Sequence, residues 1–190
     1  MCLDETSVQL VAETRTPSPV EPGQPARYDY EYERNGVAAV YMITEPLRGW
    51  REVVVGNHRT AIEFAYVIKH LVDVHFADVE QIVLVMDQLN VHTPGSLYEA
   101  FSPVEAKRLA HKLEIHHTPK HSSWLNMAEA ELSVLTRQCL DRRIPDQDTL
   151  LDEVSAWGHG RNVKQSGIDW CFTTVDARIK LKRLYPAMLP

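Results

Sequence analysis

The chain has 190 residues, of which 44% are apolar and 24% charged, with a formal net charge of −6. This size fits one domain of an ordinary globular protein. No apolar run approaches the roughly 20 residues that cross a membrane, and the N-terminus lacks a signal-peptide core, so we expect a cytoplasmic protein without membrane contact. Three widely spaced cysteines indicate reduced thiols rather than a zinc cage. Because the net charge is negative, any DNA contact would depend on local basic clusters.

The first third of the sequence predicts an antiparallel meander with a broken first strand. Met1 to Glu5 is typical of the end of a strand whose beginning is missing, with Val8 to Val11 as a candidate continuation. Alternating aromatic and acidic residues from Tyr28 to Glu33 predict a half-exposed strand, and Asn35-Gly36 predicts a hairpin turn after it. The next two strands are expected at residues 37–43 and 50–55.

The rest of the chain alternates helices and short strands. Thr60 and Glu63 have capping-box spacing ahead of an apolar stripe, which predicts a helix. The apolar run 82–86 predicts a central strand buried on both faces. Other helices are predicted to begin at Ser96, at Ser102, at Ser122 or Ser123 and near Asp148, with a strand at 113–117 and a basic tail helix at 174–184. This order predicts an α/β fold in one domain over residues 1–190: a mixed sheet, the meander plus two parallel strands, flanked by helices.

Carboxylates follow two of the predicted strands. Asp4 lies near the end of the first strand and Asp87 directly follows the central one. Because the first and fourth strands of such a sheet can lie side by side, the two side chains would be neighbours. Asp87 also has a simpler interpretation, in which it caps the following turn. Clustered carboxylates repel one another unless a divalent cation offsets their charge, and oxygen ligands suit magnesium or manganese.

The long helix after Ser122 would pack across these two carboxylates and supply a third. Periodicity alone does not choose between Glu129 and Glu131, which flank its apolar stripe at similar angles on opposite sides. Asp73 and Asp78 lie around a helix end, where acidic residues are usually solvated.

Four segments resemble an insertion-sequence transposase. They are Cys-Leu-Asp-Glu at 2–5, Val-Met-Asp-Gln-Leu-Asn-Val-His at 85–92, Thr-Pro-Lys-His-Ser-Ser-Trp-Leu-Asn-Met-Ala-Glu at 118–129 and Arg-Ile-Lys-Leu-Lys-Arg-Leu-Tyr-Pro at 178–186. Over essentially the whole chain, the sequence is similar to the bacterial six-thirty insertion-sequence family of the mariner superfamily. The resemblance implies a ribonuclease-H-like fold and a DDE catalytic triad of Asp4, Asp87 and Glu129, with 41 residues between the last two. Glu131 is then expected to be solvated.

The same resemblance implies a function. The triad would bind two Mg²⁺ or Mn²⁺ ions ~4 Å apart, cut DNA at transposon ends and join the freed 3′-hydroxyl to target DNA at a TA dinucleotide. The partners would be the inverted-repeat ends, target DNA, a second copy of the chain and an upstream-frame helix-turn-helix product, since no such module precedes Met1. The protein would be nucleoid-associated when acting. Two alternatives are a non-catalytic transposase remnant that dimerises with full transposase, and another ribonuclease-H-like nuclease.

Several polar residues are candidates for supporting roles. Asn90, His92 and Asn126 would help to orient phosphate or metal-bound water, although hydrogen bonds within the loop also explain Asn90 and His92. No zinc site is expected at His116, His117 and His121, because adjacent strand residues point to opposite faces, and Trp124 is expected to be a packing anchor. The candidate DNA-binding residues are Arg137, Arg142, Arg143, Arg178, Lys180, Lys182 and Arg183.

Overall fold

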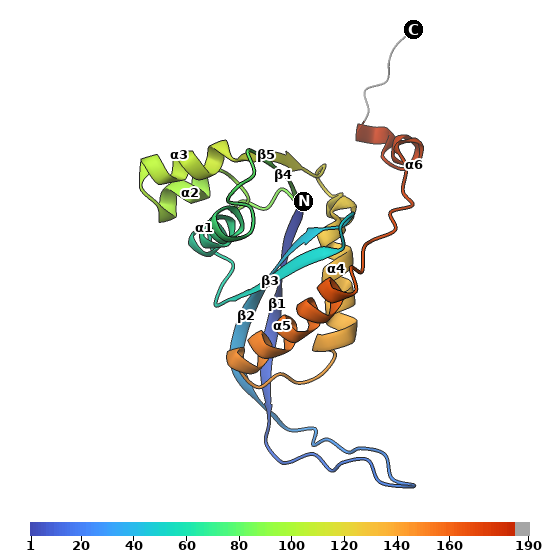
Figure 1. Ribbon diagram of the computed structural model, residues 1–190. Coiled ribbons are helices and arrows are strands. Elements are labelled where there is room, and N and C mark those ends of the chain that lie inside the picture. Colours follow the sequence, from blue (N-terminus) through green and yellow to red (C-terminus); the bar gives the residue numbers. More distant parts are fainter. Residues whose placement is uncertain (185–190) are drawn as a thin grey trace.

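Five strands form one mixed sheet in the computed structural model, which describes residues 1–184 (Figure 1). Tyr185 and Pro186, which end the fourth segment quoted above, lie outside the described residues. The strand order is β3-β2-β1-β4-β5. The antiparallel part is β1 (Cys2–Glu13), β2 (Tyr32–Glu45) and β3 (Trp50–Gly56), and the parallel part adds β4 (Ile82–Met86) and β5 (Leu113–His117). The predicted meander with two parallel strands is confirmed.

Helices cover both faces of this sheet (Figure 1). One face carries α1 (Ala61–His70), α2 (Gly95–Ala100) and α3 (Pro103–His111), and the other carries α4 (Met127–Leu135) and α5 (Gln147–Val163). The short α6 (Thr174–Lys180) lies beyond them. Two π-helical segments, η1 (Leu71–His75) and η3 (Thr136–Leu140), extend α1 and α4, and the 3-10 turns are η2 (Ser123–Leu125) and η4 (Lys182–Leu184). Among residues 1–184, no helix is long and apolar enough to cross a membrane.

Strand side chains alternate between two apolar cores. Leu3 and Tyr41 belong to the core beneath α1, together with Leu84. Cys2 and Val40 belong to the core beneath α4 and α5. Since successive residues of a strand point to opposite faces, neighbouring positions of β1 look toward different helix layers.

The central strand β4 is fully buried on one face only. Ile82, Leu84 and Met86 are buried on the α1 side, whereas Val83 on the opposite face is 48% exposed. Helix α4 packs on β1 and β2, and α5 packs on β3, so the far face of β4 is left less covered. The prediction of a strand buried on both faces is wrong, because an apolar run does not reveal which faces receive a helix.

Strand β1 is longer than the sequence predicted. It continues to Glu13, so Asp4 lies near its start and not near its end. Beyond the sheet body, β1 and β2 extend into an arm (Figure 1), closed by residues 14–31 and by an isolated bridge between Ser18 and Arg27. The strand expected from Tyr28 begins only at Tyr32.

Asn35-Gly36 lies inside β2 and forms no hairpin turn. Gln9 pairs with Val37 but Val11 pairs with Arg34, so β2 carries one extra residue at this point, a β-bulge. Gly36 has a φ of 97°, which glycine adopts without steric cost. The dipeptide therefore supplies the backbone conformation that was expected of it, but in a bulge.

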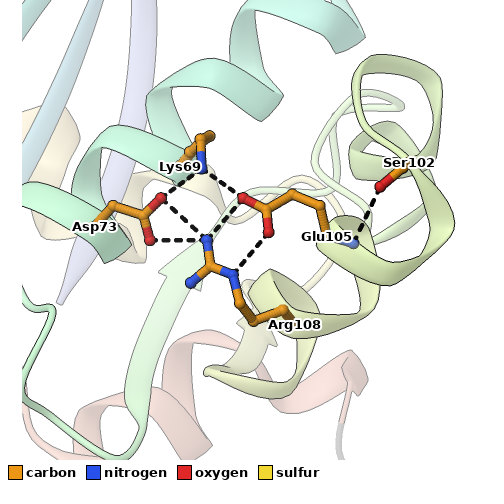
Figure 2. A network of polar contacts seen from close by, with 5 residues as sticks. All are labelled: Lys69, Asp73, Ser102, Glu105 and Arg108. Carbon is orange, nitrogen blue, oxygen red and sulfur yellow. Dashed lines mark hydrogen bonds and ion pairs between the residues drawn. The ribbon is translucent and has the colours of Figure 1, made fainter.

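A surface ion network ties α1 and η1 to α3 (Figure 2). The Lys69 ammonium lies 2.6 Å from Asp73 and 2.5 Å from Glu105, and the Arg108 guanidinium contacts both carboxylates. Hydrogen bonds from Arg108 and Lys69 lower the pKa of Glu105 to about 2. Asp73 is thus ion-paired, contrary to the expectation that it is merely solvated. The predicted start of α3 at Ser102 is confirmed, since its hydroxyl accepts from the Glu105 N–H.

Glu131 lies in a buried ion network between β3, α4 and α5. Its carboxylate is 3.1 Å from the Arg51 guanidinium and 2.9 Å from that of Arg161, and only 1% of its side chain is exposed. The Asn162 side chain reinforces the junction by donating to the Arg51 carbonyl at 2.7 Å and accepting from the Arg51 N–H at 2.8 Å. The expectation that Glu131 is solvated is wrong, because arginines from two other elements reach it.

Replacing Glu131 with Ala should strongly destabilise the protein. The change leaves the fully buried Arg51 without its counter-charge, and breaking one partner of a buried pair costs roughly 3–5 kcal/mol. Urea unfolding would measure the loss. Glu153→Ala is the matched control, because Glu153 pairs with Arg142 at the surface, where an ion pair contributes about 1 kcal/mol or less. Equal losses in the two variants would contradict the structural role of Glu131.

Candidate active site

The register between β1 and β4 brings Asp4 and Asp87 side by side. Cys2 pairs with Val85 in this parallel ladder, so Asp4 is level with Asp87 two residues further on. Cys2 and Val85 both pack in the core beneath α4, and alternation turns Asp4 and Asp87 toward the same face. Two acids from adjacent strands therefore lie at the same level of the sheet, and the charge of Asp87 acts on Asp4.

Asn126 sets the start of α4 beside these carboxylates. Its side-chain oxygen accepts from the Ala128 N–H at 3.2 Å and caps the helix, a role that the sequence had assigned to Ser122 or Ser123. Its side-chain NH₂ donates to the Leu3 carbonyl at 2.7 Å and to Asp4 Oδ2 at 3.3 Å. One amide thus begins the helix and ties it to β1.

Glu129 lies in the first turn of α4, where a carboxylate is favoured by the helix dipole. Its backbone N–H donates to the Asn126 carbonyl at 3.1 Å. The negative charge of Glu129 acts on Asp4, as does that of Asp87. The helix therefore adds a third carboxylate to the pair on the strands.

Asp4 is strongly affected by its buried position. Only 6% of the residue is exposed, and burial raises its pKa to about 7. A hydrogen bond from the Glu5 N–H to Asp4 Oδ1, at 2.8 Å, opposes this rise, while the charges of Asp87, Glu5 and Glu129 add to it. A buried carboxylate among other carboxylates is the electrostatic setting that a divalent cation relieves.

A buried histidine joins Asp87 to the opposite face of the sheet. His92 is fully buried, with Nδ1 2.7 Å from Asp87 Oδ1 and Nε2 2.8 Å from Glu5 Oε2. Burial by itself lowers the pKa of His92, but its hydrogen bond to Glu5 and the charges of Glu5 and Asp87 outweigh burial and raise it. The ring packs on Phe64 of α1 at a centroid distance of 5.1 Å. Sequence reasoning missed Glu5, since nothing in the chain signals a contact across 87 positions.

Asp87 caps the turn that follows it. Its Oδ1 accepts from the Leu89 N–H at 3.0 Å, which is a turn cap, and also contacts His92. His117 supports the same loop by donating to the His92 carbonyl at 2.8 Å. A cavity of about 260 Å³ opens beside Asp87, lined also by Lys120, His121 and Ser123.

The remaining candidate residues fall into four settings. Asn90 is exposed on the loop after Asp87. Arg142 pairs with Glu153, and Arg143 pairs with Glu13 at 2.5 Å at the base of the arm. Arg137 lines a cavity of about 480 Å³ at the far end of α4. The exposed basic residues of the tail are Arg178, Lys180, Lys182 and Arg183.

Trp124 joins the tail to the beginning of α4. Its ring stacks edge-on against Phe172 at 5.0 Å, and the Lys180 ammonium lies 4.9 Å from the ring centroid. The predicted packing anchor thus holds the C-terminal segment two residues before Asn126.

Comparison with known proteins identifies the family. The family model of DDE superfamily endonucleases matches residues 1–151. The chain belongs to this superfamily. No curated protein sequence matches it significantly.

Solved structures of Mos1 transposase share the fold of this DDE endonuclease. The Mos1 paired-end complex with the left transposon end aligns at a TM-score of 0.55 and 14% identity, over 86% of this chain and 50% of that chain. The Mos1 mariner paired-end complex with Mn aligns at a TM-score of 0.53 and 16% identity, over 87% and 50% of the respective chains. The likeness confirms the predicted ribonuclease-H-like fold. The present chain spans about half the length of these proteins.

The raised pKa of Asp4 makes the metal-free DDE endonuclease domain less stable as the pH rises. Between the ordinary value of 3.8 and about 7, the folded protein holds a proton that the unfolded chain has released, so stability falls across this window. Asp4→Asn should therefore stabilise the protein at pH 8 in chelator, by up to about 4 kcal/mol, and change little at pH 4. Urea unfolding at both pH values measures this. A variant less stable than the wild type at pH 8 would contradict the electrostatic account.

Proposed function

We propose that this chain is the catalytic domain of a transposase of the six-thirty insertion-sequence family, which cleaves DNA at transposon ends and transfers the freed end into target DNA. The proposal is supported by three acids of a DDE endonuclease: Asp4 on β1, Asp87 directly after β4 and Glu129 on α4. The charges of Asp87 and Glu129 both act on the buried Asp4. Family membership supports nuclease chemistry, and the fold shared with Mos1 transposase is consistent with transposition.

The three carboxylates have the ligand chemistry of a divalent-metal site, although within residues 1–184 their oxygens do not all lie within 4.8 Å of one another. Asp4 is the natural shared ligand, since its carboxylate feels the charges of both Asp87 and Glu129. We propose Mg²⁺ or Mn²⁺, two ions in the catalytic complex, bound through these hard oxygen ligands. Such ions activate a water or 3′-hydroxyl nucleophile and stabilise the leaving oxygen of an in-line phosphoryl transfer.

The surrounding residues would keep this site in place. His92 holds one oxygen of Asp87, and its second nitrogen is fixed by Glu5. Asn126 sets the distance between β1 and the helix that carries Glu129. Asn90, exposed on the same loop, is available to phosphate. The protein thereby fixes ligands before DNA or metal binds.

The DNA backbone would approach over the start of α4. Lys180 lies on Trp124, and the same tail carries three further exposed cations. We propose that Arg178, Lys180, Lys182 and Arg183 contact phosphates, with Arg137 as an additional contact. Arg142 and Arg143 are weaker candidates, since carboxylates already neutralise them.

Transposition would also require partners. We propose a homodimer that holds two transposon ends, and a helix-turn-helix product of an upstream frame that reads the inverted repeats. A non-catalytic regulatory partner or another ribonuclease-H-like nuclease is distinguished from this proposal by the cleavage assay below, run on element-end duplex and on RNA–DNA hybrid.

Asp87→Asn and Glu129→Gln should each reduce metal-dependent DNA cleavage by at least on the order of 10²-fold, because each removes a ligand charge while keeping the side-chain shape. Nicking of supercoiled plasmid and cleavage of an element-end duplex, with Mg²⁺ and with Mn²⁺, would measure the loss. Asp78→Asn, at an exposed acidic residue, is the matched control. Undiminished cleavage by Asp87→Asn would refute the assignment.

Charge reversal in the tail tests the DNA path. The double variant Lys180→Glu, Arg183→Glu should weaken binding to duplex DNA of any sequence. It should also reduce the slope of log K against log salt concentration by roughly two, since two phosphate contacts are removed. Fluorescence anisotropy at several salt concentrations measures both effects. Arg27→Glu with Arg34→Glu, on the arm, has the same net charge and serves as the control. Equal effects of the two pairs would rule out a specific role for the tail.

A further inference from the structure

Two histidines are brought together by a π-helical turn at the end of α1. His70 ends the α-helix and His75 ends the π-helical segment that follows it. Residues five apart in an α-helix point about 140° away from each other, since each residue turns 100°. In a π-helix the i and i+5 positions fall on the same side. Such segments are rare overall, but those that occur are often found at functional sites. Here the two imidazole Nε2 atoms are 3.1 Å apart.

A carboxylate from the edge strand completes the group. Glu52 of β3 places one oxygen 3.8 Å from His70 Nε2 and the other 3.7 Å from His75 Nε2. Glu52, His70 and His75 each offer a possible metal-ligand atom, and these three atoms all lie within 4.8 Å of one another. Within residues 1–184, no other group of three histidine, cysteine or acidic residues meets this criterion. The cluster therefore joins two elements that are otherwise held by apolar packing.

The surroundings hold the ligands without closing the site. The Trp50 ring packs edge-on against His75 at 5.1 Å and against Phe76 at 5.5 Å, which fixes the imidazole. The side chains of His70, Glu52 and His75 are 41%, 33% and 23% exposed, so an ion can enter from solvent and keep a water ligand.

We propose that Glu52, His70 and His75 form a binding site for a divalent transition-metal ion of the zinc class. Two nitrogens bound at ~2.1 Å in tetrahedral geometry lie about 3.4 Å apart, close to the observed separation, and a small rotation of Glu52 brings its oxygen into range. Two histidines and one carboxylate with an open position suit zinc and its neighbours, not magnesium.

This site is separate from the carboxylates of the nuclease. Glu52 lies on β3, and β2 stands between β3 and the strand that carries Asp4. The bound ion would fasten the edge strand to the end of α1, and thereby to the network of Lys69 and Asp73 on the same turns (Figure 2). Its role is structural, and its test does not depend on DNA cleavage.

Titration of the whole chain with Zn²⁺, in the presence of millimolar Mg²⁺, tests the site by calorimetry and by melting. We expect one Zn²⁺ per chain and, at about 100-fold excess over Kd, a rise in Tm of roughly 5–10 °C. His70→Ala, His75→Ala and Glu52→Gln should each weaken binding by more than about tenfold. His111→Ala, at an exposed histidine, and Asp87→Asn should retain it.

A spectroscopic readout covers the case in which a histidine variant folds poorly. Co²⁺ bound to the wild type should give visible absorption of a four-coordinate site, and Zn²⁺ should abolish it. Wild-type protein that binds Zn²⁺ no more tightly than millimolar, or variants of all three ligands that bind as well as the wild type, would overturn the proposal. The group would then be only a hydrogen-bonded histidine pair beside a carboxylate.

Discussion

The buried contact of Glu131 with Arg51 and Arg161 is the constraint on which the arrangement of α4 depends. Three elements distant in sequence meet at one carboxylate that is 1% exposed. Because an unpaired charge in this position would cost several kcal/mol, the helix has little freedom to rotate or slide. Glu129, two residues earlier on the other flank of the apolar stripe, is thereby held toward Asp4. One acid of the helix provides anchorage so that another can face the proposed metal site.

The two faces of β1 also carry residues with different roles. Asp4 points toward α4, where burial and, to a lesser extent, the neighbouring carboxylates raise its pKa. Glu5 points to the other face and binds His92, which in turn holds Asp87. The acids that would bind metal and the residues that position them are thus separated by the pleat of one strand. Asn126 supplies the corresponding link to the helix.

Several sequence patterns correctly predicted a backbone conformation or a helix cap, but not the structural element or the residue in which it occurs. Gly36 adopts the positive φ that Asn-Gly signals, but in a β-bulge, because the pairing of β1 with β2 continues past it. The long helix begins where expected to within a few residues, but Asn126 caps it, since a 3-10 turn intervenes after Ser122. Local patterns report backbone preference, while the partner strand decides whether that preference makes a turn or a bulge.

The sequence by itself determined the mixed sheet, the helix starts at Thr60 and Ser102, and, through its family motifs, the three acids proposed as ligands. These depend on short-range periodicity, capping and motif spacing. Tertiary structure alone decided that Glu131 is a buried anchor, that Glu5 reaches His92 and that Glu52 meets His70 and His75. Each of these contacts joins residues whose separation carries no local signal, and their burial and charge pairing exist only once the sheet has set its register.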